Sequence, residues 1–536
     1  MADRLRPRVA YFCMEFGLHE DFRIYSGGLG ILAGDILKAA KEGRYPLVGV
    51  GILWRQGYVK QHISSDGRVY DCFTDYQYSF LKDTRLKVNL LIRGRQVVCK
   101  VWKCEAFANV PLYLLDADLP ENPDRLITGQ LYGWFSEERI AQEMILGIGG
   151  IRALRALGLK IDIYHFNDSH PVLAATELIR EEMETDQVSF EEAWKRVRRR
   201  IVFTTHTPVP AGNEEHEHEL LRYMGAYNGL TFGQMLKLGG DPFNMTVAGL
   251  RLSKRANAVS KLHAVTARKM WQDVTQAAPI LAITNGVHGK TWQDERIRRA
   301  YAQGGDLWAA HVLAKRELLK EVYRRNGIHL REDALLIGFG RRAASYKRSD
   351  LIFKKKKVIE PLLRTKKIQL IFSGKAHPND LKGKEIVSNL VKMAKEYAES
   401  VVFLEDYDMK LGKLLTRGCD VWLNNPIRPM EASGTSGMKA ALNGVLNLSV
   451  LDGWWPEGCK HGVNGWQIGN GYQGPKADQI DSQSLYQVLL KEVLPVYYHN
   501  RSRWIKMMRA SIKTAEDKFT ALRMLKDYYT LMYSNP

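Results

Sequence analysis

Residues 431–444 read Glu-Ala-Ser-Gly-Thr-Ser-Gly-Met-Lys-Ala-Ala-Leu-Asn-Gly, and the stretch passes from small and hydroxyl residues into a helix-forming run. Ser433, Thr435 and Ser436 are good helix N-cap residues, while Gly434 and Gly437 allow the backbone to approach a ligand closely. The first N–H groups of a helix have no partner within the helix, so a phosphate group binds readily at such a start.

Lys439 falls in the first turn of this predicted helix. A lysine at that position can form a Schiff base with a cofactor whose phosphate lies on the turn. The same residues also suit a plain glycine-rich turn between a strand and a helix, with Lys439 on the surface. Local spacing alone leaves both interpretations open.

The segment as a whole resembles the pyridoxal-phosphate attachment segment of the α-glucan phosphorylases, which act on glycogen, starch and maltodextrin. In that family the lysine after Gly-Thr-x-x-Met carries the cofactor and an Asn-Gly pair follows, as Lys439 and Asn443-Gly444 do here. The commoner family form has Gly-Asn where this chain has Ser436-Gly437. The resemblance implies that the cofactor is pyridoxal 5'-phosphate and that Lys439 holds it.

The length of 536 residues favours two large domains, or three. The chain is 45% hydrophobic and 26% charged, which is typical of a soluble globular protein. It has no apolar run long enough to span a membrane, and its N-terminus lacks the apolar segment of a signal peptide. The six cysteines form no zinc-type pairs. We therefore expect a reduced, cytoplasmic protein with no metal site and no membrane partner.

The net charge of +19 invites a nucleic-acid interpretation. The basic runs at 198–200 and 354–357, however, lie within helix-like segments, and no known nucleic-acid-binding motif is present. We expect no nucleic-acid partner, and we assign the charge to the attraction of phosphate-bearing substrates.

Predicted strands in the first half of the chain end in polar residues. The strands are expected over residues 8–12, 161–165 and 201–205. Open α/β sheets bind ligands at the carboxyl ends of their strands, although a lone histidine is more often structural than catalytic. The polar residues that follow these strands are the glycine loop Ser26-Gly27-Gly28-Leu29-Gly30 before a helix, the run Asn167-Asp168-Ser169-His170-Pro171, and His206.

A second series of alternating strands and helices begins at residue 334, with further strands over 368–373, 401–404, 421–424 and 444–450. Its first strand runs into Arg341, Arg342, Tyr346, Lys347 and Arg348. Four cations within eight residues repel one another, so this run suits either a solvated loop or a clamp for phosphate groups.

The two series predict an α/β fold with two Rossmann-like domains that face across a cleft, the GT-B architecture. Residues 1–295 are expected to form the first domain, with the glycine loop and the glucan site. Residues 296–505 are expected to form the second domain, with the pyridoxal phosphate site. The helices of 506–536 are expected to pack back on the first domain, as the resemblance implies.

The resemblance extends over nearly the whole chain and implies a role for individual residues. Lys439, Arg342, Lys347 and His206 are the implied catalytic residues, with Arg342 and Lys347 as the clamp for the substrate phosphate. The implied cofactor contacts are Lys439, Thr435, Ser436, Gly437, Gly434, Arg341, Tyr407 and Trp292. The implied substrate contacts are Gly28, Leu29, Asp168, His170, His206, Asn285, Tyr346, Glu431 and Ser433. One departure is Asp408, where regulated members carry a basic residue.

The activity implied is the reversible phosphorolysis of terminal α-1,4-glucosidic bonds of glycogen or maltodextrin by inorganic phosphate, which releases α-glucose 1-phosphate. No glycosidase-type pair of carboxylates stands out in the motifs. The resemblance implies instead that the cofactor phosphate lies beside the substrate phosphate and relays protons to it. Two adjacent phosphates repel strongly, so compensating cations are required.

Two other classes of function remain in view. A nucleotide-sugar-dependent glycosyltransferase of the glycogen synthase type shares the fold and a basic clamp, but it has no need for Lys439 in this context. The other class is an inactive glucan-binding protein, although every expected catalytic position is present. The first predicted strand begins close to residue 1, so we expect no N-terminal phosphorylation segment and no allosteric control. A homodimer is one assembly that fits the resemblance.

Overall fold

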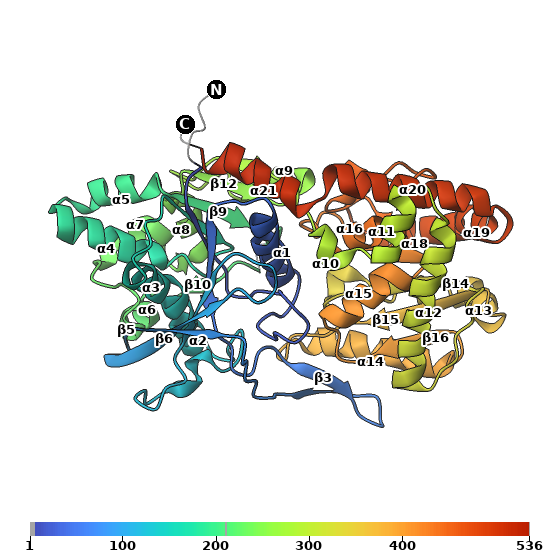
Figure 1. The fold of residues 1–536 in the computed structure, drawn as a ribbon, viewed down its shortest axis with the longest axis horizontal. Coiled ribbons are helices and arrows are strands. Elements are labelled where there is room, and N and C mark those ends of the chain that lie inside the picture. Colours follow the sequence, from blue (N-terminus) through green and yellow to red (C-terminus); the bar gives the residue numbers. More distant parts are fainter. Residues whose placement is uncertain (1–5, 210–211, 535–536) are drawn as a thin grey trace. The chain divides into compact units, whose positions relative to one another are not determined.

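The computed structural model describes residues 6–209 and 212–534, and these divide into two compact units. Unit 1 comprises Met1–Tyr58, Phe73–Thr284 and Ala521–Pro536. Unit 2 comprises Val59–Cys72 and Asn285–Thr520. Each unit has its own sheet (Figure 1) and its own apolar core.

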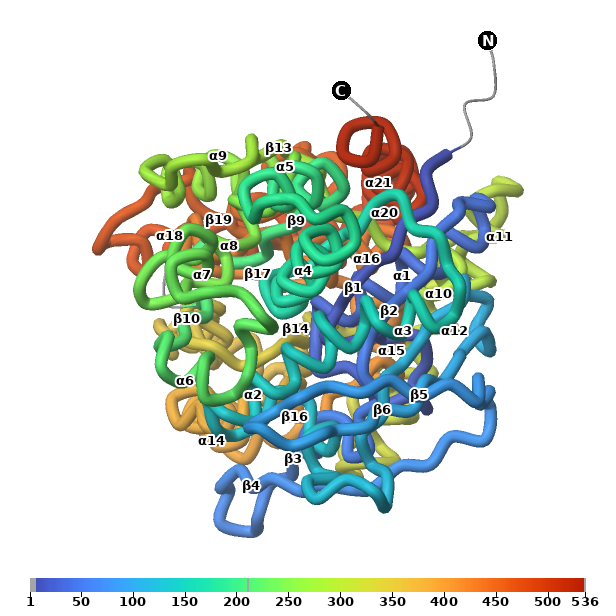
Figure 2. The backbone as a smooth tube through the Cα atoms, turned by 90° about the vertical axis from the view of Figure 1, so that its left-hand side faces the viewer, coloured from blue at the N-terminus to red at the C-terminus, as the bar shows by residue number. Residues whose placement is uncertain are grey.

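Among the described residues of unit 1, nine strands form one sheet, parallel from β13 to β7 and antiparallel at β6 and β5. Figure 2 shows β5 and β6 side by side. The strands in spatial order are β13 (Ile280–Ala282), β12 (Arg255–Ala258), β9 (Ile201–Thr205), β8 (Ile163–Asn167), β1 (Val9–Phe12), β2 (Leu47–Ile52), β7 (Leu112–Asp116), β6 (Arg95–Cys104) and β5 (Lys82–Ile92).

Helices and short pairings complete unit 1. The π-helical segment η2 joins α2 to α3 without a break in the helix. The elements are α1 (Gly28–Glu42), η1 (Arg125–Thr128), α2 (Ser136–Met144), η2 (Ile145–Gly149), α3 (Gly150–Ala156), α4 (Ala174–Asp186), α5 (Phe190–Arg198), β10 (Glu215–His216), α6 (His218–Met224), α7 (Phe232–Gly239), β11 (Phe243–Asn244), α8 (Met245–Leu252), α9 (Lys261–Met270), α21 (Ala521–Asp527) and η7 (Tyr528–Met532).

The central strands of unit 1 are buried along their whole length, because helices cover a parallel sheet on both faces. The segment at 521–534 contributes to this core, where α21 packs on α1 and Tyr528 and Met532 are fully buried. The Tyr533 hydroxyl lies 2.7 Å from His165 Nδ1 on β8. These contacts explain why residues far along the chain belong to unit 1.

Six parallel strands form the sheet of unit 2 in the part of the chain that the structure describes. Apolar runs with few charges are typical of such strands, because both faces of the sheet are covered. In spatial order they are β16 (Val401–Leu404), β15 (Ile368–Ser373), β14 (Leu335–Gly340), β17 (Val421–Asn424), β18 (Leu446–Val450) and β19 (Gly465–Ile468).

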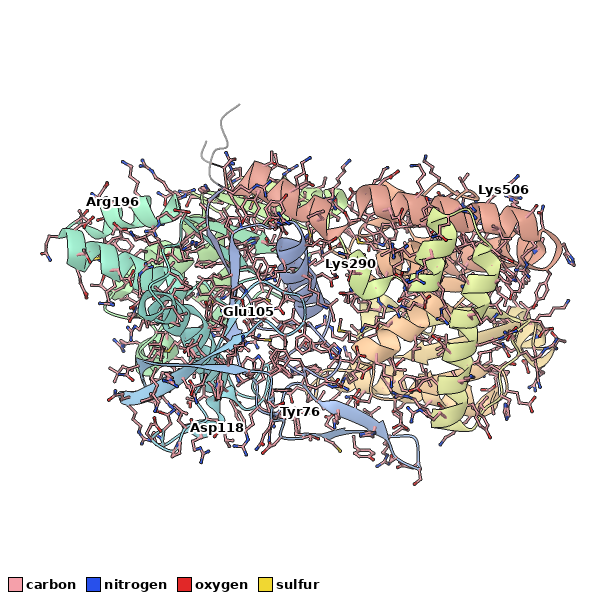
Figure 3. The ribbon with its side chains drawn as sticks, viewed as in Figure 1. Tyr76, Glu105, Asp118, Arg196, Lys290 and Lys506 are labelled. Atoms are coloured by element: carbon pink, nitrogen blue, oxygen red, sulfur yellow. The ribbon has the colours of Figure 1, made fainter. Side chains whose placement is uncertain are left out.

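The helices of unit 2 alternate with these strands. Helix α16 packs against α20, where Met508 and Ile512 lie close to Gly444. Figure 3 shows charged side chains over the surface, such as the exposed Lys506 on α20. The helices are α10 (Gly289–Trp292), α11 (Glu295–Ala302), α12 (Leu307–Asn326), η4 (Ser345–Lys347), η5 (Leu351–Phe353), α13 (Lys356–Arg364), α14 (Leu381–Glu396), α15 (Met409–Gly418), α16 (Ser436–Leu442), α17 (Trp455–Gly458), α18 (Ala477–Val488), η6 (Leu489–Val493), α19 (Leu494–His499) and α20 (Arg501–Lys518).

A hairpin from early in the chain also belongs to unit 2. It consists of β3 (Lys60–Ile63) and β4 (Val69–Cys72), which pair antiparallel. Ile63 and Val69 pack against the core of unit 2, and Asp71 forms an ion pair with Lys384 on α14. Within the described residues, no helix has the length and apolarity to cross a membrane.

Candidate active site

The carboxyl ends of three neighbouring parallel strands carry the candidate residues of unit 1. Strand β8 lies between β1 and β9, so the residues after these strands meet at one edge of the sheet. They are Glu15 after β1, Asp168 and His170 after β8, and His206 after β9. The sheet thus brings together three residues that the sequence assigns to substrate binding.

Asp168 and His206 are held by the ends of their strands. The Asp168 N–H donates to the Thr204 carbonyl, and Asp168 has a φ of 72°, which is uncommon outside glycine. His206 Nε2 lies 2.7 Å from the Asn167 side-chain oxygen, so the proton is assigned to Nε2 and Nδ1 is left as an acceptor. Burial lowers the pKa of the His206 imidazole to about 3. His206 is therefore a neutral hydrogen-bonding group at neutral pH.

Burial also shifts the pKa values of Asp168 and His170 at this edge. It raises the pKa of the Asp168 carboxyl to about 7 and lowers the pKa of the His170 imidazole to about 4. His170 is 7% exposed, and its Nδ1 has no hydrogen-bond partner among the described residues. A buried polar atom without a partner is costly, so His170 suits a hydroxyl-bearing ligand.

The glycine loop between β1 and α1 is fixed by Glu15. The Glu15 carboxylate accepts from the Ser26 N–H at 2.6 Å, the Ser26 hydroxyl at 2.9 Å and the Gly27 N–H at 3.1 Å. Gly28 and Leu29 then form the first turn of α1, where the N–H groups have no acceptor within the helix. Glu15 thus accepts hydrogen bonds from the amides just before the two residues predicted to contact phosphate.

In unit 2, the strand ends bring two cations to one carboxylate. Arg341 follows β14, and its Nη2 lies 2.6 Å from Glu431 Oε2. Lys347 Nζ lies 2.7 Å from the same oxygen. Burial alone would raise the pKa of the Glu431 carboxyl, but the charges of Arg341 and Lys347 lower it to about 2. The three side chains are each at most 10% exposed, so this is a buried and highly polar cluster.

Other members of the basic run have different environments. Arg342 is exposed, and Tyr346 lies beside Lys347, whose Nζ is 4.6 Å from the tyrosine ring centroid. Arg348 is buried and forms ion pairs with Asp478 and Asp481. Arg348 is therefore accounted for by the packing of α18 against the loop.

Lys439 lies on α16 beside a buried tryptophan. Its Nζ is 3.6 Å from the centroid of the Trp292 ring, and Trp292 is 1% exposed. Asn443 donates to the carbonyls of both Trp292 and Lys439 and accepts from the Asp294 N–H. The Asn443 side chain thus joins α10 to α16 and fixes the tryptophan beside the lysine. Asn285, at the first position of this part of unit 2, is also buried.

The turn before α16 has a tightly packed backbone. Thr435 occupies the N-cap position without a side-chain cap bond, and the Ser436 hydroxyl accepts from Trp422 Nε1. Gly434 has a φ of 74°, which favours glycine. A Cβ on Gly437 would lie 2.6 Å from the Asn447 side-chain oxygen, so a side chain at 437 would displace Asn447. The Ser433 hydroxyl is buried without a hydrogen-bond partner in the described chain.

Asp452, which follows β18, fixes the position of Glu431. Its carboxylate accepts from the backbone N–H groups of Glu431 and Gly453. Burial raises the pKa of the Asp452 carboxyl to about 7. Gly453 has a φ of 57°, and a Cβ there would lie 2.2 Å from the Ser433 carbonyl oxygen. The turn of 431–437 and the loop after β18 are therefore one packed structure.

Tyr407 packs against Gly340 at the end of β14 and Gly412 in α15. A Cβ on Gly340 would be 3.1 Å from its ring, and one on Gly412 would be 3.2 Å from its hydroxyl. Burial raises the pKa of the Tyr407 hydroxyl. Asp408 is the N-cap of α15 and accepts from the Leu411 N–H. The acidic residue at 408 thus has a structural role as a helix cap.

Sequence reasoning did not assign site roles to Glu15, Asn443 or Asp452. Glu15 and Asp452 each follow a buried strand by a few residues, which is the signal that could have identified them.

No group of three or more histidine, cysteine, aspartate or glutamate side chains suits a metal ion within residues 6–209 and 212–534. All six cysteines are free.

Comparisons with known proteins agree with these features. The profile of the family described as carbohydrate phosphorylase matches residues 151–226 and 300–457. Those ranges include Asp168, His170, His206, the basic run after β14 and the segment of Lys439.

Several relatives are similar over almost the whole chain. A maltodextrin phosphorylase from Thermococcus litoralis is 41% identical, over 98% of this chain and 70% of the relative. A glycogen phosphorylase from Aquifex aeolicus is 35% identical, over 99% of this chain and 87% of the relative. An uncharacterised protein from Methanocaldococcus jannaschii is 37% identical, over 98% of this chain and 99% of its own length.

Proposed function

Because this chain belongs to the carbohydrate phosphorylase family, we propose that it is an α-glucan phosphorylase, a hexosyltransferase. It uses inorganic phosphate to cleave the terminal α-1,4-glucosidic bond of glycogen or maltodextrin, reversibly, and releases α-glucose 1-phosphate. The observation that carries this proposal is the 41% identity to a maltodextrin phosphorylase over 98% of the chain.

The residues around Lys439 fit pyridoxal 5'-phosphate. The Lys439 amine is nearly buried beside Trp292, which suits a reactive amine next to a planar ring. The Ser433 hydroxyl and Arg341 Nε are buried without hydrogen-bond partners in the described chain. A Cβ on Gly434 would lie 3.5 Å from Arg341 Nη2, so the turn and this cation are neighbours. When bound, the cofactor supplies a phosphate group that can carry a proton.

We assign the groups that would hold this cofactor as follows. Lys439 holds it covalently, and Thr435, Ser436, the Gly437 N–H and Arg341 bind its phosphate. Tyr407 and Trp292 line its ring. The hydroxyls and amides of the turn are suitable donors to a phosphate.

The substrate phosphate requires cations, and Lys347 and Arg342 supply them in this proposal. Lys347 is nearly buried, so its charge is weakly screened and acts strongly on a bound anion. Glu431 holds Lys347 and Arg341 in place through a shared oxygen. A bound phosphate would replace part of the interaction that these two cations make with Glu431.

In this proposal the terminal glucose of the glucan is bound by polar groups, several of them at the strand ends. His206 is neutral because of its low pKa, so its free ring nitrogen accepts a hydrogen bond from a sugar hydroxyl. Asp168, His170, Asn285, Tyr346 and Ser433 complete the proposed sugar contacts. Gly28 and Leu29 offer N–H groups toward phosphate, as their place at the start of α1 allows.

The proposal includes two Rossmann-like domains that face across a cleft, with the residues of both acting on one substrate. Each unit has a largely parallel sheet with polar residues at its strand ends, which supports the Rossmann-like character of each domain. The proposed setting is the cytoplasm, which suits six free cysteines.

The test is an assay of glucose 1-phosphate release from a maltodextrin length series with inorganic phosphate. We expect phosphate-dependent release together with the absorbance band of a protein-bound pyridoxal group. Glucan elongation from a nucleotide sugar, without that band, would assign the chain to the synthase class instead. Glucan binding without any turnover would contradict the enzyme.

A further inference from the structure

Tyr132 has an unusual backbone conformation. Its φ is 65°, in the left-handed region that bulky residues rarely adopt. Such a conformation is strained and persists only where the surrounding structure fixes it. Tyr132 precedes α2, and its side chain has partners on two sides. The position therefore calls for an explanation from those contacts.

On one side, the Tyr132 hydroxyl donates to Glu15 Oε1 at 2.6 Å. Glu15 is 2% exposed, and both of its oxygens are engaged by the Ser26 and Gly27 groups of the glycine loop. A Cβ on Gly30 would lie only 2.6 Å from Glu15 Oε2. The carboxylate is thus fixed between the loop and the tyrosine, with no room to move toward α1.

On the other side, the guanidinium of Arg139 lies over the tyrosine ring, 4.5 Å from its centroid. Arg139 Nε lies 2.6 Å from Glu214 and 3.8 Å from Glu143. Glu143 is fully buried and lies 2.9 Å from His216 Nε2. Glu143 on α2 and Glu214 just before β10 therefore fix the arginine, and the arginine fixes the ring.

We propose that Tyr132 is a positioning residue for the glycine loop, and that it acts through Glu15. The inference rests on the proposed function, in which Gly28 and Leu29 offer their amides to phosphate. The hydroxyl of Tyr132 orients the Glu15 carboxylate, which accepts from the two preceding amides. The direction of the amides at the start of α1 then follows from that carboxylate. Tyr132 itself touches neither phosphate nor glucan in this scheme.

The experiment compares Tyr132→Phe, Glu15→Gln and the double variant with the parent enzyme. Tyr132→Phe keeps the ring under Arg139 and removes only the hydroxyl donor. We expect the KM for phosphate to rise about fivefold to tenfold, as for the loss of an ordinary hydrogen bond, because Tyr132 acts on phosphate only indirectly, with the KM for maltodextrin within about twofold. The double variant is expected to be no worse than Glu15→Gln alone, because both changes break one chain of contacts.

A second measurement does not depend on turnover. Hydrogen exchange, followed by mass spectrometry, reports on the peptide that spans residues 22–32. We expect faster exchange of the Ser26 and Gly27 amides in Tyr132→Phe and in Glu15→Gln. Tyr223→Phe is the matched control, because Tyr223 is 58% exposed on α6, and it should leave both readouts unchanged.

The outcomes separate this inference from the proposed function. Unchanged exchange in both folded variants would overturn the positioning role, whatever the activity. Equal losses for phosphate and maltodextrin in Tyr132→Phe, or additive losses in the double variant, would also overturn it. A parent enzyme without phosphorolysis would remove the proposed function, and the exchange result would still decide whether Tyr132 orders the loop.

Discussion

Replacing Glu431 with glutamine removes the carboxylate that Arg341 and Lys347 share while leaving the shape of the side chain almost unchanged. In the parent protein, the two cations lie 2.6 and 2.7 Å from one Glu431 oxygen. The variant keeps both cations buried but leaves them with an amide as partner. We expect it to fold, to be less stable and to respond more strongly to phosphate.

The size of the effect follows from the pKa of Glu431. Its fall from an ordinary value of 4.5 to about 2 corresponds to roughly 3 kcal/mol at pH 7. Loss of one partner from a buried ion pair typically costs about 3–5 kcal/mol, which agrees. For a domain of the size of unit 2, each kcal/mol shifts Tm by roughly 2–4 °C. We therefore expect Tm to fall by about 6–12 °C at pH 7.

The sign of the pH dependence gives a second check. The folded-state pKa is depressed, so the stabilisation is complete above about pH 4.5 and is lost as the pH falls toward 2. The difference between the parent and Glu431→Gln should shrink over that range. Phosphate at 100 times its Kd adds about 2.7 kcal/mol to the free energy of unfolding of any form that binds it. Because Arg341 and Lys347 lack their shared carboxylate in Glu431→Gln, we expect phosphate to raise the Tm of the variant more than that of the parent.

The assay is thermal unfolding in phosphate-free buffer and in a phosphate series, at pH 7 and at acid pH. Glu295→Gln is the matched control, because Glu295 also pairs with two arginines but is half exposed. Its Tm should stay close to that of the parent. Equal Tm values for Glu431→Gln and the parent at pH 7 would refute the reasoning, as would a gap that widens in acid.

Three further predictions concern other residues. Borohydride reduction followed by peptide mapping should label Lys439, and a label on another lysine would contradict the cofactor assignment. Arg342→Ala should raise the KM for phosphate roughly tenfold with a much smaller effect on glucan, since a charge-assisted contact is worth about 1.5–3 kcal/mol, and kinetics with equal losses would contradict the clamp. Burial alone would raise the pKa of the Glu177 carboxyl, but hydrogen bonds from Arg152 and Arg180 lower it to about 2. Glu177→Gln should therefore lower Tm at pH 7 by several degrees, with the difference vanishing as the pH falls from about 4.5 to 2, and a pH-independent difference would show that the charge is not responsible.

The parallel strands could be predicted from the sequence because they are short apolar runs with polar ends. The predictions over 201–205, 368–373, 401–404 and 421–424 are confirmed residue by residue. The strand expected over 161–165 lies at Ile163–Asn167, two residues later, because Asn167 pairs with β9 as well. No strand is predicted over β5, where Lys, Asp and Arg face solvent on alternate positions of an edge strand.

The candidate site was predictable in its motifs and not in its supporting contacts. Lys439, Glu431 and the basic run are close to one another in sequence or follow strands of one sheet. The contact from Tyr132 to Glu15 joins residues 117 positions apart, and no local pattern indicates it. The pairing of Arg341 and Lys347 on Glu431 was likewise not expected, because the sequence gives no measure of which anion a buried cation selects.

Each unit contains segments that are far apart in the sequence, and this affects how the protein folds during its synthesis. Domains generally fold in the order in which the ribosome delivers them. Here Asp71 of the hairpin emerges 313 residues before its partner Lys384, and His165 emerges 368 residues before Tyr533. Unit 1 cannot close its core until unit 2 has been synthesised, and unit 2 depends on a hairpin that was synthesised with unit 1. Both apolar cores are therefore incomplete while the chain is being synthesised. Expressing the N-terminal or the C-terminal half of the chain alone should yield an aggregation-prone product.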